Sequence, residues 1–507
     1  MTKRPVARVL PESRLPQLDR LFDYVVPDGT DVPVGARVKV PIGRSGTLHT
    51  GFVVERLESS DFGGDLSSID QVLSAVPVLT EEIWASALAL SKRQAGGVAD
   101  VLRLAVPPRA VRVEKKWLEA HREAPALPDR PLAPQSMSAS DWERVTATGV
   151  RLVWHLRHGV SGTTPEGYGD IVSAATAHLS EGKSVIVAVP DWRDIALIEQ
   201  ALLDRVDPSH LVVFSSELTP SEVYARHLQC LEGRPLIVLG SRHAVYAPVS
   251  ELGAIVVVSD GDDAHRELLA PYPHSRDVAL IRAEQTGCAV ILAGWTPSIE
   301  AVRFVDMGYF EETSPTLSSR ARVFPTLLAL HGQDNPGPAR LPSQAFAAAK
   351  DALKNGPVLV QVFRAGFAPG LVCAECGARA RCPDCGGPLR HSGSGAPASC
   401  GWCQQLHSRF HCAECQSVAL RPSGQGVGRT VTELGKAFPG VQVVQADGEH
   451  KFVSVPDKPA LVVATRGAEP VAEGGYHAAL LLDGAAMLQR SALDALEETL
   501  AAWEWAI

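Results

Sequence analysis

The sequence predicts a multidomain α/β protein in which a small N-terminal β-domain precedes two parallel-sheet domains, the second interrupted by a cysteine-rich insertion. Three observations predict this. The chain has 507 residues, which is too long for a single hydrophobic core. Its central and C-terminal parts contain Val/Ile runs without polar alternation, separated by amphipathic helices, as in sheets covered on both faces. Eight of its ten cysteines form four Cys-x-x-Cys pairs between residues 373 and 415.

The N-terminal part has the pattern of short strands broken by turns. Strands are expected at 6–10, 22–26, 37–40 and 50–54. A helical stretch is expected at 80–104, with Thr80 as its N-cap. Four prolines between residues 123 and 140 then predict a linker.

The two later parts alternate helices with buried strands. The first block predicts strands at 184–189, 211–214, 236–239, 254–258 and 289–293. The second predicts strands at 358–362, 441–444, 461–464 and 479–482 and a helix at 491–505. The predicted domains are therefore a β-domain at 1–115, a linker at 116–145, one α/β domain at 146–335 and another at 336–507, with the cysteine module at 370–420.

Charge and hydropathy narrow the possible functions. The net charge of −9 argues against a uniformly basic nucleic-acid binder, but residues 1–50 carry eight Lys/Arg and five Asp/Glu, so a polyanion site is expected near the N-terminus. No run of 18 apolar residues is present, and the first residues lack the apolar core of a signal peptide. We therefore expect a cytoplasmic protein without a membrane partner.

The four Cys-x-x-Cys pairs predict two structural zinc ions, because four thiolates complete one tetrahedral site. The spacing alone permits a nested pairing, in which the outer pairs share one ion and the inner pairs the other, or a sequential one. His391, His407 and His411 are nearby but not needed as ligands. The surrounding arginines can either offset the thiolate charge or bind DNA. The remaining cysteines, Cys230 and Cys288, are predicted to be inert core residues.

Four collinear stretches resemble the PriA family of replication-restart helicases. They are residues 18–27 with 35–43, residues 239–248, the Ala-Gly-Phe-Ala-Pro segment at 365–369, and the eight cysteines. The resemblance implies two RecA-like, helicase-type domains with the zinc module in the second, and a winged-helix domain reduced or absent between residues 116 and 145. It also favours the nested pairing, which assigns the ligands as Cys373, Cys376, Cys412 and Cys415 for zinc 1 and Cys382, Cys385, Cys400 and Cys403 for zinc 2.

The resemblance further implies a pocket for the 3′ end of a DNA strand, made by Phe22, Asp23 and Gly43. A carboxylate can accept a hydrogen bond from a terminal 3′-hydroxyl, and an aromatic ring can stack on the last base. The alternative is that all three residues only shape the β-domain. One departure counts against the pocket, because the family's lysine is replaced here by a serine near Ser67.

The motor motifs of the family are degraded. The phosphate-binding loop corresponds to residues 158–167, which lack the Gly-Lys-Thr; no lysine occurs between Lys116 and Lys183. The magnesium-binding Asp-Glu is replaced by Ser-Asp-Gly-Asp-Asp at 259–263, and residues 464–470 replace the glycine-rich coupling motif. The arginine-finger motif is not present in the sequence. We therefore expect a pseudo-helicase for which ATP is an unlikely cofactor.

The resulting expectation is a nucleoid-associated component of the restart primosome that recognises abandoned or stalled forks without ATPase or helicase activity. Its expected partners are forked or D-loop DNA, the proteins that load the replicative helicase, and single-strand DNA-binding protein. One alternative is an active ATP-dependent 3′→5′ helicase with a divergent nucleotide site. Another is a zinc-ribbon interaction protein without a role in DNA binding.

Overall fold

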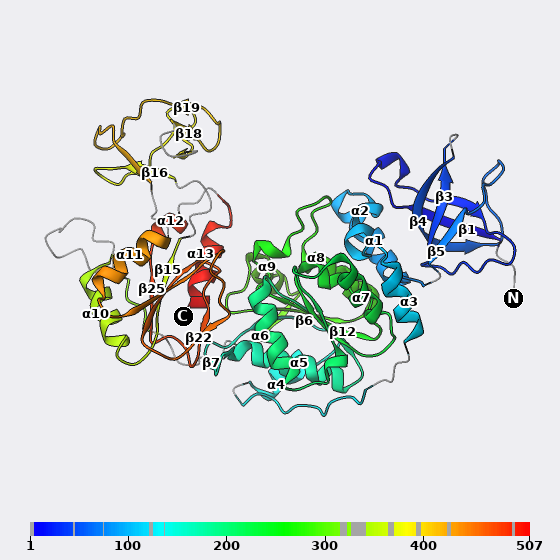
Figure 1. The fold of residues 1–507 in the computed structure, drawn as a ribbon, viewed down its shortest axis with the longest axis horizontal. Coiled ribbons are helices and arrows are strands. Elements are labelled where there is room, and N and C mark those ends of the chain that lie inside the picture. The colour runs from blue at the N-terminus through cyan, green and yellow to red at the C-terminus, as the bar shows by residue number, and fades with distance from the viewer. Residues whose placement is uncertain are drawn as a thin grey trace. The chain divides into compact units, whose positions relative to one another are not determined.

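The computed structural model describes residues 5–43, 46–74, 76–120, 125–135, 137–314, 322–325, 341–363, 370–391, 397–422, 427–488 and 492–506. The chain divides into two compact units (Figure 1). Unit 1 contains Met1–Leu156 and Gly167–Thr316, and unit 2 contains Arg157–Glu166 and Leu317–Ile507. The predicted boundaries at 115, 145 and 335 follow sequence pattern and stay predictions. Among the described residues, no helix is long and apolar enough to span a membrane.

Unit 1 begins with a five-stranded antiparallel sheet in the order β2-β1-β4-β3-β5. Its strands are β1 (Val6–Pro11), β2 (Phe22–Val25), β3 (Arg37–Ile42), β4 (Thr47–Leu57) and β5 (Gln71–Ser74). The segment before β5 closes the sheet onto β2, because the Val25 N–H donates to the Ser67 carbonyl at 2.9 Å and the Ile69 N–H donates to the Val25 carbonyl at 3.0 Å. The four expected strands are present, and only β5 was not predicted.

The helical stretch expected at 80–104 is two helices, so the prediction of one stretch was wrong. They are α1 (Glu81–Gln94) and α2 (Val98–Ala105). Thr80 caps α1 by accepting from the Ile83 N–H, as expected. The helix ends at Gln94 and is followed by Ala95, whose φ of 50° is left-handed. The Asp19 carboxylate then caps α2 by accepting from the N–H groups of Val98 and Ala99. The Gly96-Gly97 pair at the break was the sequence signal that should have divided the stretch.

A seven-stranded parallel sheet follows, in the order β10-β11-β9-β12-β13-β6-β14. Its strands are β6 (Arg151–His155), β9 (Ser184–Ala188), β10 (Leu211–Phe214), β11 (Ile237–Gly240), β12 (Leu252–Val258), β13 (Ala289–Gly294) and β14 (Glu311–Glu312). The helices of this part are α3 (Val111–Glu119), α4 (Ala139–Val145), α5 (Glu166–Ser180), α6 (Trp192–Leu203), α7 (Pro220–Cys230), α8 (Ser275–Thr286) and α9 (Ile299–Asp306). Helices lie on both faces of the sheet (Figure 1), which explains why β9, β11 and β13 are buried throughout.

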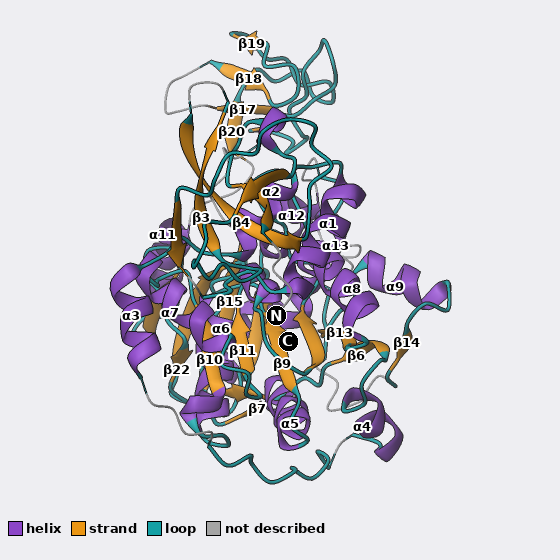
Figure 2. Ribbon diagram, turned by 90° about the vertical axis from the view of Figure 1, so that its right-hand side faces the viewer, coloured by secondary structure: helices purple, strands orange, loops and turns teal. Residues whose placement is uncertain are grey.

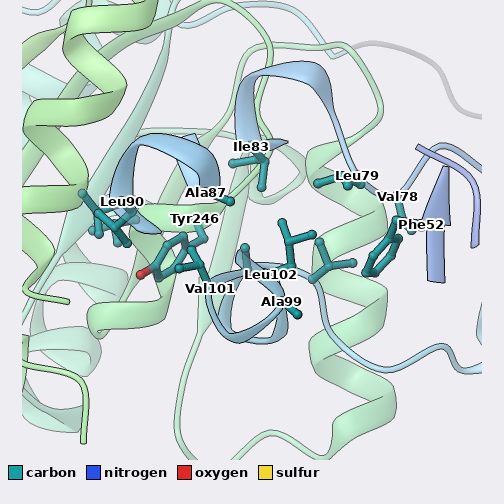
Figure 3. Close-up of a cluster of buried hydrophobic side chains, with 14 of the residues drawn as sticks. Phe52, Val78, Leu79, Ile83, Ala87, Leu90, Ala99, Val101, Leu102 and Tyr246 are labelled. Carbon is teal, nitrogen blue, oxygen red and sulfur yellow. The ribbon is translucent and has the colours of Figure 1, made fainter. Parts of the chain in front are cut away.

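One hydrophobic cluster joins the N-terminal helices to this sheet domain within unit 1. Phe52 of β4, Ile83 of α1 and Leu102 of α2 pack in the same cluster as Tyr246, which precedes β12 (Figure 3). Arg282 of α8 is fully buried and pairs with Glu82 of α1 at 2.7 Å. The β-domain, its two helices and the parallel sheet therefore share a continuous core.

Unit 1 is expected to lose stability in acid because it buries neutral histidines. Burial lowers the pKa of His227 on α7 to about 4, although its Nε2 contacts the Val78 carbonyl at 2.9 Å. The unfolded chain therefore takes up this proton first, so the contribution is complete above about pH 6.5 and is lost as the pH falls toward 4. We expect a loss of about 2.5 kcal/mol from this residue, measured by urea unfolding at pH 7 and pH 4.5. His227→Gln keeps a donor that does not titrate, so an equal acid sensitivity in that variant would contradict the assignment.

Unit 2 contains a four-stranded parallel sheet in the order β21-β23-β15-β25. Its strands are β15 (Val358–Val362), β21 (Gln442–Ala446), β23 (Ala460–Thr465) and β25 (Ala478–Leu481), with the short pairs β7 (Val160–Ser161) with β8 (Thr164–Pro165) and β22 (Ser454–Val455) with β24 (Val471–Ala472) outside it. Its helices are α10 (Ser343–Ala352), α11 (Val427–Ala437), α12 (Gly484–Leu488) and α13 (Ala495–Ala506).

The cysteine module lies between β15 and α11, as the sequence predicted. Its strands are β16 (Leu371–Cys373), β17 (Leu389–His391), β18 (Ala398–Cys400), β19 (Leu406–His407) and β20 (Leu420–Pro422). These strands are two or three residues long, and Figure 2 shows that the module consists mainly of loops. Such short pairings are not stable on their own, so the module needs a further source of stability.

Candidate metal centres and nucleic-acid interface

The four Cys-x-x-Cys pairs fold into four turns of the same kind. In each turn, the N–H four residues after the first cysteine donates to that cysteine's carbonyl. The donors are Gly377 at 3.1 Å, Gly386 at 2.9 Å, Gln404 at 3.1 Å and Gln416 at 3.0 Å. The first cysteine's own N–H donates to the carbonyl of the residue after that donor, at 2.7 to 2.9 Å in all four turns. Repeated geometry of this kind presents both thiols of a pair to the same side.

The fourth residue after the first cysteine always has a positive φ, between 60° and 75°. Glycine occupies this position in the first two turns, as Gly377 and Gly386, but Gln404 and Gln416 occupy it in the other two. Gly401, which directly follows Cys400, does not supply the positive φ of its turn, because the turn needs it three residues later, at Gln404. Gly401 instead makes room for Arg390, whose Nε lies 2.8 Å from where a Cβ would stand.

The turns bring the eight cysteines together in the nested arrangement. The outer cluster contains Cys373, Cys376, Cys412 and Cys415, and the inner cluster contains Cys382, Cys385, Cys400 and Cys403. Within each cluster the ligand atoms all lie within 4.8 Å of one another.

The spacing of the sulfur atoms fits zinc. The Sγ–Sγ distances across the pairs are 3.5 Å for both contacts of the outer cluster, and 3.4 and 3.8 Å in the inner cluster. A tetrahedral zinc ion with Zn–S bonds of ~2.3 Å requires sulfurs about 3.8 Å apart, whereas a disulfide would place them ~2 Å apart. Four thiolates also leave no open coordination position, so such a site is structural rather than catalytic.

The remaining two cysteines are core residues, as predicted. Cys230 and Cys288 are buried in the hydrophobic cluster of the unit 1 sheet. Burial raises the pKa of the Cys230 thiol to about 12, and burial also raises the pKa of Cys288. Both thiols are therefore protonated at neutral pH and poor nucleophiles.

The three residues predicted to bind a 3′ end belong to two strand ends of the β-domain. Phe22 is half-buried against the core of the sheet, with the Arg20 guanidinium carbon 4.9 Å from its ring centroid. Gly43 follows β3 with a φ of 74°, and a Cβ there would meet nothing within 4 Å. Asp23 lies on the other face of β2 from Phe22, because neighbouring strand residues alternate. Among the described residues no contact joins the three, so the pocket stays a prediction.

Asp23 is held by partners that the sequence did not reveal. Its carboxylate accepts from Arg8 Nε at 2.9 Å and from Ser60 Oγ at 2.6 Å. The hydrogen bond from Arg8 lowers the pKa of Asp23, so the carboxylate is ionised at neutral pH and can only accept hydrogen bonds. Arg8 pairs with Asp23 across β1 and β2, which a strand register could have indicated, whereas Ser60 lies in a loop without a sequence signal.

The segment at 157–166 includes most of residues 158–167, which correspond to the phosphate-binding loop by the resemblance described above. It forms the two-residue strands β7 and β8, with Pro165 in β8, and the Glu166 N–H donates to the Gly159 carbonyl at 2.9 Å. The Glu166 carboxylate pairs with Arg157 at 2.8 Å. It also lies close to Gly159, where an added Cβ would be 3.1 Å from the carboxyl carbon of Glu166. A negative charge therefore occupies the start of α5, where a helix would otherwise attract phosphate.

In unit 1, the carboxylate that follows β12 is already paired. Asp260 is buried and accepts from Arg276 Nη1 at 2.5 Å and from Ser298 Oγ at 2.7 Å. Arg276 also pairs with Glu300 at 3.1 Å. The contacts from Arg276 and Ser298 are both made to Oδ2 of Asp260, so a buried guanidinium offsets the charge of this carboxylate.

Comparison with known proteins identifies the lineage. Residues 9–107 match the family model of a 3′ DNA-binding domain. The chain is 41% identical over 515 residues to the "Probable replication restart protein PriA" of Mycobacterium bovis, covering 97% of this chain and 76% of that protein. The chain belongs to the PriA family. Identity is 40% to the corresponding Mycobacterium leprae protein, over 97% of this chain and 77% of the relative, and 26% to PriA of Haemophilus influenzae, over 85% and 69%.

The PriA family match includes the DNA-binding domain, which in this structure runs from β1 through α2. Solved structures add little. T4 UvsW is similar with a TM-score of 0.24 and 12% identity, covering 69% of this chain and 60% of its own. RecG, solved bound to a three-way DNA junction, has a TM-score of 0.30 and 12% identity, over 57% and 36%. At these TM-scores neither similarity supports an argument about this PriA member.

Proposed function

We propose that this PriA-family protein recognises abandoned or stalled replication forks and binds branched DNA without hydrolysing ATP. The observation that supports the absence of ATP hydrolysis is the structure and sequence of the segment at 157–166. A nucleotide-driven motor needs a lysine that contacts the β- and γ-phosphates, and this segment contains no lysine. It contains instead a proline within β8 and the Glu166 carboxylate at the start of α5. The Asp260–Arg276 pair supports the same conclusion, because a carboxylate whose charge is offset by a buried guanidinium attracts a magnesium ion less strongly.

We propose further that each four-cysteine cluster holds one zinc ion. The outer cysteines would hold the first ion and the inner cysteines the second, in sites whose sulfur spacing already fits. When bound, the ions supply a structural cross-link between the turns and no catalysis. In this chain the turns point the thiols inward, and the paired strands β17 and β18 connect the two Cys-x-x-Cys pairs of the inner cluster.

The β-domain is the part proposed to meet DNA. If Asp23 receives a terminal 3′-hydroxyl, Asp23→Ala should weaken binding to a fork with an exposed 3′-OH by roughly tenfold, the worth of one charge-assisted hydrogen bond. Fluorescence anisotropy would compare this fork with one that ends in a 3′-phosphate, which an ionised carboxylate repels. The variant should bind the two forks equally.

A matched control variant distinguishes a role of Asp23 in binding the 3′ end from an effect of the substitution on the structure of the β-domain. Glu55→Ala removes the other carboxylate partner of Arg8, on the neighbouring strand, and should leave the preference for 3′-OH unchanged. If wild-type protein shows no preference between the two forks, or if Asp23→Ala keeps it, the pocket is wrong. Equal affinity for a fork and a blunt duplex would also contradict the proposed recognition of branched DNA.

The proposal includes the partners that fork restart requires. These are the proteins that load the replicative helicase and single-strand DNA-binding protein, which the cysteine module is proposed to contact, at a nucleoid location. The contact with DNA should weaken as salt rises, because lysines and arginines that bind phosphates release counterions.

A further inference from the structure

The inner cysteine cluster has a contact with the side chain of His407, and in the described part of the chain His407 has no such contact with the outer cluster. His407 ends β19, which pairs with β18 through Ala398. Its Nε2 lies 3.2 Å from Cys382 Sγ, and 3.9 Å from the Asp384 carboxylate. The imidazole is only 10% exposed, so its position is held by packing.

His407 is placed as a donor to the cluster and not as a fifth ligand. Cys382, Asp384 and His407 lie within 4.8 Å of one another, but His407 does not fall within that distance of all four inner cysteines. Those four thiols already complete a tetrahedral set. The ring nitrogen therefore reaches one sulfur from outside, the position from which an N–H donates to a thiolate.

Such a contact matters because of charge. A zinc ion with four thiolates carries a net charge of −2, and a half-buried anion of this kind is stabilised by N–H donors aimed at its sulfurs. Side chains in this outer position commonly change metal affinity by about 10- to 100-fold when they are removed. Among the described residues, no histidine makes a comparable contact with the outer cluster, so the two sites are unequal.

We propose that His407 donates its Nε2–H to the Cys382 thiolate of the zinc-loaded inner cluster and thereby slows loss of the inner ion. The inference rests on the zinc binding proposed above. We infer in addition that the two zinc ions are released at different rates, and that His407 is the reason why the inner ion is released more slowly.

The test is zinc release from the full chain into excess chelator, followed by the absorbance of the zinc complex of 4-(2-pyridylazo)resorcinol. His407→Phe keeps the ring shape without a donor, and His407→Gln places an amide N–H near the position of Nε2. We expect two release phases in the wild type, one phase accelerated about tenfold in His407→Phe, and a rate near wild type in His407→Gln. Two zinc ions per chain before the chelator is added show that each variant is folded.

The other outcomes are separable. Release of both ions at wild-type rates from His407→Phe overturns the inference. Equal acceleration of both phases also overturns it, because a merely structural role would loosen the whole module. Wild-type protein that carries no zinc would instead contradict the proposed metal binding. A change in the sulfur-to-metal charge-transfer band of the cobalt-substituted protein, in His407→Phe but not in His407→Gln, would report the same hydrogen bond independently.

Discussion

Cys400→Ser is expected to remove one of two zinc ions and to unfold the inner part of the cysteine module. Cys400 is buried, ends β18 and lies 3.4 Å from Cys385 Sγ. The module's strands are too short to hold it, so the metal supplies most of its stability, on the order of 10 kcal/mol for a structural zinc site. Zinc content by mass spectrometry should fall from two to one per chain, and trypsin should cut within the module at Arg390 or Arg409.

Loss should stay local, because the parallel sheet of unit 2 has its own core around β15 and β23. Cys230→Ser is the matched control, since it replaces a buried cysteine outside the clusters and should keep both ions. Two bound zinc ions and unchanged protease resistance in Cys400→Ser would contradict the assignment of the inner ligands.

Arg276→Met is expected to destabilise unit 1 by about 3–5 kcal/mol, because it leaves the buried Asp260 carboxylate without its cation. Among the described residues, the hydroxyl of Ser298 would remain as the hydrogen-bond partner of that carboxylate. Methionine keeps much of the arginine's apolar volume, so packing changes little. Calorimetry of the full chain should show the transition of unit 1 at a lower temperature while that of unit 2 does not move.

The pairing can be tested with a second substitution. Asp260→Asn in the Arg276→Met background removes the unpaired negative charge of the buried carboxylate and should recover a large part of the lost stability. If the double variant is as unstable as Arg276→Met alone, the loss comes from packing and not from the ion pair. In that case Asp260 would no longer be explained as a structural carboxylate.

The buried strands could be predicted closely from the sequence, because burial on both faces leaves an uninterrupted apolar run. The predicted 358–362 coincides with β15, which is buried throughout, and the predicted 254–258 lies within β12. Two strands of the unit 1 parallel sheet could not be predicted in this way. In β6, the buried residues Leu152 to Trp154 are flanked by Arg151 and His155, so the apolar run is only three residues long, and the edge strand β14 consists of two exposed glutamates.

Local spacing indicated the candidate metal ligands, whereas the partners of the other candidate residues depend on tertiary structure. Four Cys-x-x-Cys turns need only residues that adjoin in sequence, so the eight cysteines were found without the fold. The partners of Asp23 and Asp260 come from elsewhere, since Ser60 is 37 residues from Asp23 and Ser298 is 38 residues from Asp260. The Ala-Gly-Phe-Ala-Pro segment at 365–369, on which part of the resemblance rests, lies outside the described residues.

The most direct test of the account is ATP hydrolysis by the purified chain with magnesium, measured in the presence of a forked DNA to which the same preparation is shown to bind. The account predicts fork binding with a hydrolysis rate no higher than that of a matched sample without protein. Turnover that rises when the fork is added, and that a second purification step does not remove, would contradict it and would favour an active helicase with a divergent nucleotide site.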